Sequence, residues 1–166
     1  WDARSHLTDK LDYLASYYVM IRPRSWGQIR SFKLAADPLV TYILDSYDSG
    51  QIAFGVGELC KALFSVGAQS LHPSIKNHGG WKSIHSVQTD MRNIKLRNKL
   101  NLMSIHLFGS CSPLNNPKFL LNNGRIKGMN NVILADGSCL PSAPGVNPQA
   151  TIMSIARRNA IKYCEE

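Results

Sequence analysis

Three features in the last third of the chain carry residue types that can do chemistry. His106 lies in an apolar segment before a Gly-Ser turn, Asp136 follows another apolar segment, and Asn147-Pro148 precedes a periodic one. An imidazole titrates near pH ~6.5 and can take a proton at physiological pH. A helix N-terminus offers free N–H groups and about half a positive charge to a developing anion. The set therefore suits an anionic or electron-accepting ligand.

Each of these residues also has an ordinary structural explanation. A lone histidine in an apolar run is more often a hydrogen-bonded core residue. An aspartate after a strand often caps the next turn, and Asn before Pro is a plain helix start. From residue types and spacing alone, both explanations stay open.

The elements around these residues predict how they are positioned. Segment 131–136 is predicted as a buried strand that ends in the carboxylate of Asp136. The last helix is predicted from Pro148 towards Tyr163, with Asn147 as its N-cap. Ligands of open α/β sheets sit beyond the carboxyl ends of strands, which is where Asp136 falls.

The first hundred residues predict strands followed by helices. The expected strands are 18–21, 26–30 and 39–44, with a break at Pro23 because proline cannot donate to a ladder. One amphipathic helix is expected between Ser49 and Gly67, and another over 84–94. The sequence Gly-Val-Gly-Glu-Leu-Cys at 55–60 only superficially resembles a dinucleotide fingerprint, because it lies inside a predicted helix. The expected fold class is α+β or α/β.

The charge balance allows a binding function. The chain has 19 Lys and Arg against 11 Asp and Glu, a net charge of +8, and its densest cationic run is 92–99. A basic interaction module for nucleic acid or an anionic surface is therefore an alternative. A solvated helix face explains the run at least as well, and an acidic upstream portion would offset the charge. The sequence holds no recognition motif, so no nucleic acid is expected as a partner.

The cysteines and histidines predict neither a metal nor a redox site. The four cysteines show no C-x-x-C spacing, and His72, His78 and His85 have gaps that match no ligand pattern. Apolar neighbours and the absence of an N-x-[ST] sequon mildly favour an intracellular location. No stretch reaches the roughly 18 apolar residues of a membrane span. The N-terminus has neither Met nor a signal-peptide pattern, so we expect the protein to continue upstream.

Several motifs resemble one enzyme family. The sequences VILADGSCLP at 132–141 and GVNPQATIM at 145–153 resemble the C-terminal signature of the glucose-methanol-choline (GMC) oxidoreductases. The sequence HLFGSC at 106–111 is similar to the family's His-x-x-Gly-(Thr/Ser)-Cys motif. The sequence RPRSWGQI at 22–29 resembles a strand of its substrate domain. Segments 37–42 and 64–68 also fit, so the match follows the family's order from 18 to 164.

The resemblance implies oxidation of a small-molecule alcohol to a carbonyl with FAD as cofactor. His106 matches the base that acts on the substrate hydroxyl while hydride passes to flavin N5. Asn147 matches the position that hydrogen-bonds the substrate oxygen. The positions that match FAD-binding ones are Asp136, Gly137, Asn147, Pro148 and Thr151. The electron acceptor, whether oxygen, a quinone or a cytochrome, stays open.

The resemblance also implies a C-terminal fragment. Residues 1–101 correspond to part of an antiparallel-sheet substrate domain with helices. Residues 102–166 carry the active-site histidine and supply the last strand and helix of a Rossmann-like FAD-binding domain. No Gly-x-Gly-x-x-Gly follows a strand here, so the expected partner is the N-terminal FAD-binding portion of the same protein. The chain alone is expected to bind FAD poorly.

Two further alternatives remain. A hydrolase built on Ser110, His106 and Asp136 lacks the G-x-S-x-G nucleophile elbow. A catalytically inactive GMC relative is suggested by 112–114, where Ser-Pro-Leu replaces the family's usual Arg-Met-Gly. The retained His106 and Asn147 argue against it.

Overall fold

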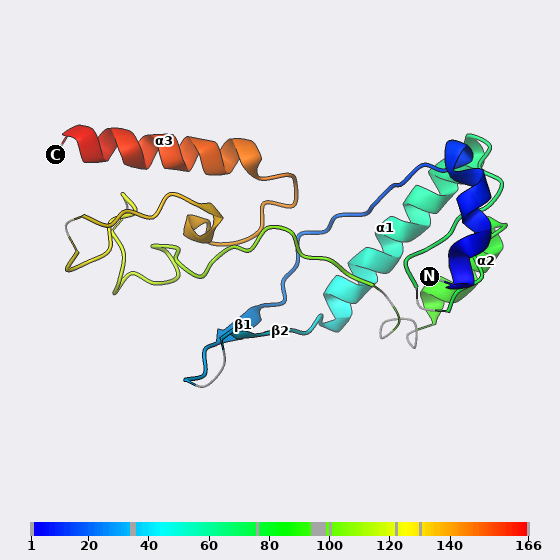
Figure 1. The fold of residues 1–166 in the computed structure, drawn as a ribbon, viewed down its shortest axis with the longest axis horizontal. Coiled ribbons are helices and arrows are strands. Elements are labelled where there is room, and N and C mark those ends of the chain that lie inside the picture. Colours follow the sequence, from blue (N-terminus) through cyan, green and yellow to red (C-terminus); the bar gives the residue numbers. More distant parts are fainter. Residues whose placement is uncertain are drawn as a thin grey trace. The chain divides into compact units, whose positions relative to one another are not determined.

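The computed structural model describes residues 2–33, 36–75, 77–93, 99, 101–121, 123–129 and 131–165 (Figure 1). The chain forms two compact units, residues 1–102 and 103–166. Their described residues combine helices with one antiparallel strand pair, which is an α+β composition. No described helix has the length and apolarity needed to cross a bilayer.

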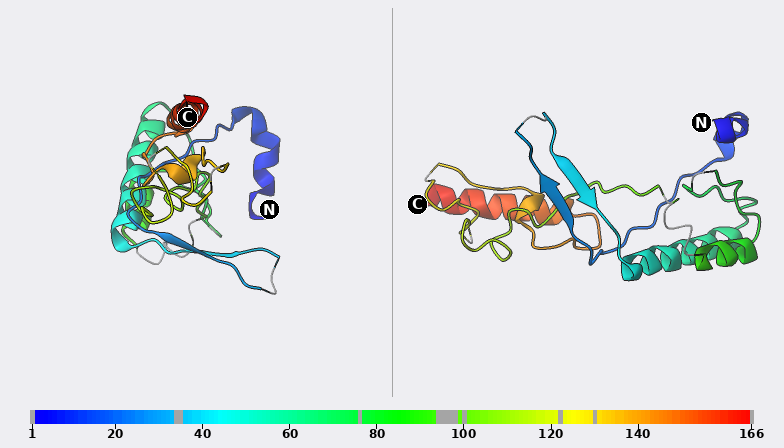
Figure 2. Two further views of the ribbon diagram at one scale, coloured as in Figure 1. Left: turned by 90° about the vertical axis from the view of Figure 1, so that its left-hand side faces the viewer. Right: turned by 90° about the horizontal axis from the view of Figure 1, so that it is seen from below.

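The first unit is built on two packed helices, α1 (Ser46–Ser65) and α2 (Ile84–Arg92), which lie side by side in Figure 2. Both confirm the amphipathic periodicity, except that Ile94, the last position of the second pattern, lies outside the described residues. The start predicted at Ser49 is wrong, because the carboxylate of Asp45 accepts the Asp48 N–H at 2.7 Å and caps α1 earlier. Gly67 follows the helix at φ +95°, as a closing glycine should.

A small apolar core joins α1, α2 and the loop between them. Cys60 of α1, Val87 of α2, and Ile75 and Trp81 of the loop are buried together. Leu71 and Trp81 exchange two backbone hydrogen bonds of 2.9 and 2.7 Å, which close the loop on this core. Burial raises the pKa of the Cys60 thiol, so Cys60 acts as a small hydrophobe.

The strands of the first unit form a two-stranded ribbon. Strands β1 (Gly27–Arg30) and β2 (Leu39–Tyr42) pair antiparallel, and every one of their residues is exposed. The unit also holds the 3-10 helix η1 (Asp2–Tyr13).

The strand predicted at 18–21 is wrong. This segment has no regular structure, and its Val19 packs on α1 where Gly55 leaves room. A Cβ at Gly55 would lie 2.5 Å from Val19 Cγ1, so this glycine serves helix packing. The location of Gly55 inside α1 confirms that the 55–60 motif is no phosphate loop.

Asp48 fastens the segment before β1 to the first turn of α1. Its buried carboxylate accepts the Arg24 N–H (2.9 Å) and the Ser25 N–H (2.8 Å), and also the Ser25 hydroxyl. Burial works to raise the pKa of Asp48, but these hydrogen bonds and the Arg24 charge outweigh it and lower the pKa. The Arg24 guanidinium also lies 3.6 Å from the centre of the Tyr47 ring.

We expect Asp48→Asn to lower the free energy of unfolding of the full-length protein by about 1.5–3 kcal/mol at pH 7. A carboxyl with a lowered folded-state pKa stabilises the fold above its unfolded pKa of ~3.9, and this contribution is lost as the pH falls through the folded value. Urea unfolding at pH 7 and near pH ~3 should therefore show the two proteins converging in acid. Glu58→Gln, which removes an exposed carboxylate from the same helix, is the control and should cost under about 0.5 kcal/mol. If the difference in free energy of unfolding between the unmodified protein and Asp48→Asn stays constant with pH, the Asp48 charge does not stabilise the fold as proposed.

The described residues of the second unit form one long helix, α3 (Gln149–Glu165), and one short 3-10 helix, η3 (Gly137–Cys139). The strand predicted at 131–136 is wrong, since the structure has a single bridge between Arg125 and Ile133 there. The pairing ends at Leu134, whose N–H donates to Gly124 O at 2.9 Å. The Gly124 N–H donates to Leu121 O instead of to Leu134, and the Leu134 carbonyl accepts a side-chain hydrogen bond of 2.9 Å from Asn159 of α3.

Asn159 and Gly124 pack closely against each other in this unit. Asn159 is 1% exposed, and its Nδ2 reaches Leu134 O directly beside Gly124. Gly124 has φ +82°, and a Cβ there would lie 2.3 Å from Asn159 Nδ2 and 2.5 Å from Leu134 O. The backbone approaches α3 this closely only because residue 124 has no side chain.

Candidate functional site

His106 and Asn147 line the same open cleft in the second unit, although they are 41 positions apart in the sequence. The cleft measures about 320 Å³, and its other lining residues are Pro148, Gln149, Ile152 and Met153. The side chains of His106 and Asn147 are both exposed. The fold therefore brings an imidazole and a carboxamide to one solvent-accessible surface.

Gly137 positions the His106 segment. A Cβ on Gly137 would lie 3.4 Å from Leu107 O and 3.5 Å from Phe108 Cε1, so the chain beside His106 rests on the start of η3. The Phe108 ring in turn lies 6.3 Å from the His106 ring, centre to centre. On its other side, the same Cβ would lie 3.3 Å from Ile152 Cδ1 of α3. Gly137 therefore sits between the His106 segment and the helix that borders the cleft.

Asp136 takes the structural role that the sequence left open. Its Oδ1 accepts the backbone N–H of Ser138 at 2.8 Å and also the Ser138 hydroxyl, which caps η3. The side chain is otherwise exposed. Asp136 thus fixes the turn that contains Gly137, next to the His106 segment.

The N-terminus of α3 borders the cleft, with Asn147 just outside the helix. The carbonyl of Pro148 accepts the Ile152 N–H at 2.9 Å, so Pro148 holds the N-cap position and the prediction of Asn147 as N-cap is wrong. Pro148 is buried, whereas Thr151 in the first turn is exposed. The first amides of a helix lack intrahelical acceptors, and here they belong to residues at the cleft. Because Asn147 does not cap, its carboxamide is available to a ligand.

The donors at this cleft fit the polar edge of an electron-accepting ring such as a flavin. Free amides and the positive end of α3 favour negative charge on a bound group. The apolar side chains of Ile152 and Met153 supply a flat-ring contact beside them. The lining therefore combines polar hydrogen-bond donors with apolar side chains, as sites for such ligands usually do.

Asn115 is a residue that sequence reasoning missed. Its Nδ2 donates to Gly109 O at 3.3 Å and to Pro141 O at 3.0 Å. The sequence placed it only in a polar, turn-forming stretch. The nearby departure from the family pattern at 112–114 was the one signal that pointed to this turn.

His78, in the first unit, has a structural role. Gly80 N–H donates to His78 Nδ1 at 2.9 Å, so His78 Nε2 carries the proton and donates to Asp90 Oδ2 at 2.8 Å. The Trp81 indole donates to the same oxygen at 2.7 Å. These hydrogen bonds lower the pKa of Asp90, and the bond from Trp81 has the largest effect. Together they tie the loop to α2.

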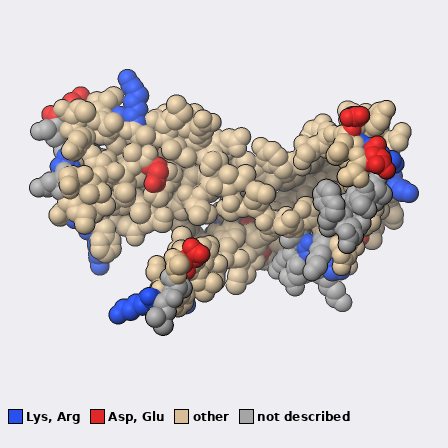
Figure 3. Space-filling view, in the orientation of Figure 1, with Lys and Arg blue, Asp and Glu red and all other residues tan. Residues whose placement is uncertain are grey.

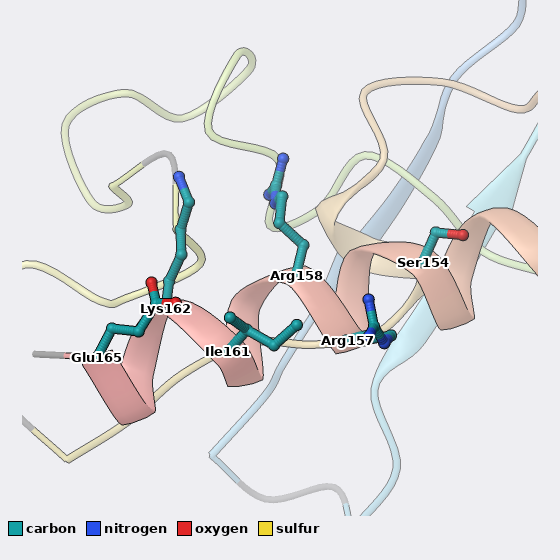
Figure 4. Close-up of a pocket in the computed structure, with 6 residues that line it drawn as sticks. All are labelled: Ser154, Arg157, Arg158, Ile161, Lys162 and Glu165. Carbon is teal, nitrogen blue, oxygen red and sulfur yellow. The ribbon is translucent and has the colours of Figure 1, made fainter.

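The described residues of two cationic features give no evidence of a second site. Figure 4 shows a shallow hollow on α3 whose labelled residues, Arg157, Arg158 and Lys162 among them, all come from that one helix. The cationic run at 92–99 lies mostly outside the described residues, which include only 92, 93 and 99 of it. On the face drawn in Figure 3, the Lys and Arg side chains lie in separate groups among acidic ones.

A family profile and two known proteins that are similar to this chain are described as GMC oxidoreductases. The family profile described as GMC oxidoreductase matches residues 23–156. A GMC-type oxidoreductase of Sinorhizobium fredii, y4nJ, is 40% identical over 96% of this chain and 32% of its own length. The GMC-type oxidoreductase Rv0492c of Mycobacterium tuberculosis is 27% identical over 89% of this chain and 23% of its own.

A third relative has a named activity. The long-chain-alcohol oxidase FAO3 of Arabidopsis thaliana is 28% identical over 86% of this chain and 20% of its own length. No solved structure matches the chain. The chain spans a third or less of the length of these relatives. With the profile match covering most of its residues, the chain belongs to the GMC oxidoreductase family.

Proposed function

We propose that this chain supplies the catalytic edge of an FAD-dependent enzyme that oxidises an alcohol to a carbonyl. The observation that carries the proposal is that His106 and Asn147 line the same cleft. Family membership supports oxidoreductase chemistry, and the relative named as a long-chain-alcohol oxidase supports an alcohol as the substrate.

The exposed side chains of His106 and Asn147 have different roles at the substrate hydroxyl. A ring nitrogen of His106 accepts the hydroxyl proton, as a general base. The Asn147 carboxamide donates a hydrogen bond to the substrate oxygen, orients it and stabilises the charge that develops as the proton leaves. FAD, when bound, would supply the acceptor for the hydride of the carbinol carbon, and oxygen, a quinone or a cytochrome would be the final electron acceptor.

The remaining site residues hold the cofactor. Asp136 and Gly137, in the turn at η3, would hold the FAD chain. Pro148, Thr151 and the backbone at Asn147 would hold the flavin ring, and the positive end of α3 would stabilise negative charge on it. Residues 102–166 thereby complete the FAD-binding domain of the full protein, whose N-terminal portion binds the pyrophosphate. Residues 1–101 belong to its substrate domain.

Anaerobic mixing of the full-length, FAD-loaded protein with an alcohol tests this function. Primary alcohols of short and long chain should bleach the visible flavin absorbance, with formation of the corresponding aldehyde. Buffer without alcohol is the control. FAD that stays bound and oxidised with every alcohol in the series would contradict the proposal and favour a catalytically inactive relative.

A further inference from the structure

We propose that Asn115 is a positioning residue, which holds the His106 segment and the loop before Asn147 at a fixed spacing. Its role in turnover rests on the proposed function. The side chain itself does not line the cleft.

One carboxamide joins the two segments that carry the site. Asn115 Nδ2 donates to the carbonyl of Gly109, three residues after His106, and to the carbonyl of Pro141, six residues before Asn147. An amide nitrogen has two hydrogens, so it can serve both acceptors. The bridge therefore sets the separation of Gly109 and Pro141 through a single planar group.

The turn that presents Asn115 is itself well fixed. Ser112 is fully buried, and its carbonyl accepts the N–H groups of Asn115 (3.1 Å) and Asn116 (2.8 Å). Its hydroxyl accepts the Leu114 N–H at 3.2 Å. Gly109 begins the turn at φ +86°, a conformation that favours glycine. The backbone thus directs the Asn115 carboxamide towards both carbonyls.

A second link keeps these segments together without Asn115. Cys111 N–H donates to Ser138 O at 3.1 Å, and Asn115 is exposed, so its truncation removes little packing. We therefore expect loss of the carboxamide to shift the spacing of the two site segments while the fold persists. Rate depends steeply on such spacing, since a displacement of about 1 Å can cost on the order of 10²-fold.

Asn116 is a matched control in the same turn. Its Nδ2 donates at 3.0 Å to Ser110 O, which lies within the turn, and makes no described contact with the loop before Asn147. Truncating Asn116 therefore removes a comparable carboxamide and one local hydrogen bond without cutting the bridge.

The test uses the full-length, FAD-loaded protein with Asn115→Ala, Asn115→Asp and Asn116→Ala. Asp has the shape of Asn, but its carboxylate cannot donate to two carbonyls. Both Asn115 variants should lower the rate constant of flavin reduction at saturating alcohol by about 10-fold or more, and Asn116→Ala by less than about 3-fold. The dissociation constant of trifluoroethanol, which resists oxidation, should rise in the Asn115 variants through the misplaced Asn147. The melting temperature of Asn115→Ala should match that of Asn116→Ala.

His106→Ala in the same series separates the two proposals. If His106→Ala slows flavin reduction while the Asn115 variants match Asn116→Ala, the positioning role is wrong and the proposed function stands. If the Asn115 variants lose FAD or melt well below Asn116→Ala, Asn115 is structural and the proposal is overturned. If His106→Ala does not slow the reaction, the proposed function is wrong and the positioning role falls with it.

Discussion

Replacing His106 with Ala in the full-length protein should slow flavin reduction by alcohol by about 10²–10⁴-fold, the range that one general base contributes. The substrate hydroxyl then has to lose its proton to water, because the cleft lining at 147–149, 152 and 153 holds no other side chain that can act as a general base. Bound FAD should stay unchanged, since the histidine is an exposed side chain at a bend in a segment without regular structure, and its removal leaves no cavity. The measurement is stopped-flow flavin bleaching at saturating alcohol.

Two companion variants sharpen this expectation. His106→Gln keeps a polar side chain in the cleft but cannot act as a base, so it should be nearly as slow as His106→Ala. His85→Ala removes an exposed histidine of α2 in the other unit and should leave the rate within about 2-fold. A His106→Ala rate as fast as that of His85→Ala would remove the catalytic role of His106.

Gly124→Ala should destabilise the protein by about 3–5 kcal/mol, far more than a typical substitution. An alanine at φ +82° costs roughly 1–2 kcal/mol in backbone strain alone. Its Cβ would also meet Leu134 O at 2.5 Å, a backbone atom that cannot swing away. Displacing Asn159 breaks the hydrogen bond from its Nδ2 to Leu134 O, and a buried donor that loses its acceptor costs about 1–3 kcal/mol.

Gly128→Ala is a close control for this effect. Gly128 has the same φ of +82° and open space around its Cβ position, so its replacement by alanine introduces backbone strain but no steric overlap. Urea unfolding of the two variants should therefore differ by about 2 kcal/mol or more. Equal stabilities would show that only the backbone conformation of residue 124 requires glycine. The neighbouring atoms of α3 would then accommodate a Cβ with little loss of free energy.

The sequence predicted well what depends on neighbouring residues. The periodicities of α1, α2 and α3 were sufficient to place all three, because one apolar face at helical spacing is a local property. His106 and Asn147 were found through motifs. Their placement at one cleft agrees with the shared site that the motifs imply, while their chemical roles stay predictions.

The sequence predicted poorly what depends on distant partners. Segment 18–21 has strand-forming residues but packs on Gly55 of α1, more than thirty positions away. The pairing expected along 131–136 ends at Leu134, whose carbonyl accepts from Asn159, and the pattern of apolar residues cannot reveal which carbonyl a remote side chain will reach. The bridge from Asn115 to Pro141 spans 26 positions and escaped notice for the same reason.

A double-mutant cycle between His106 and Asn147 tests most directly whether the two residues act on one substrate in one cleft. The rate constant of flavin reduction is measured for His106→Ala, Asn147→Ala and the double variant, all with FAD bound. Residues that act as a unit are strongly non-additive, so the double variant should be only slightly slower than His106→Ala, with a coupling of about 1 kcal/mol or more. Two single effects that simply multiply in the double variant, to within about 2-fold, would show that His106 and Asn147 act independently and would contradict the shared site.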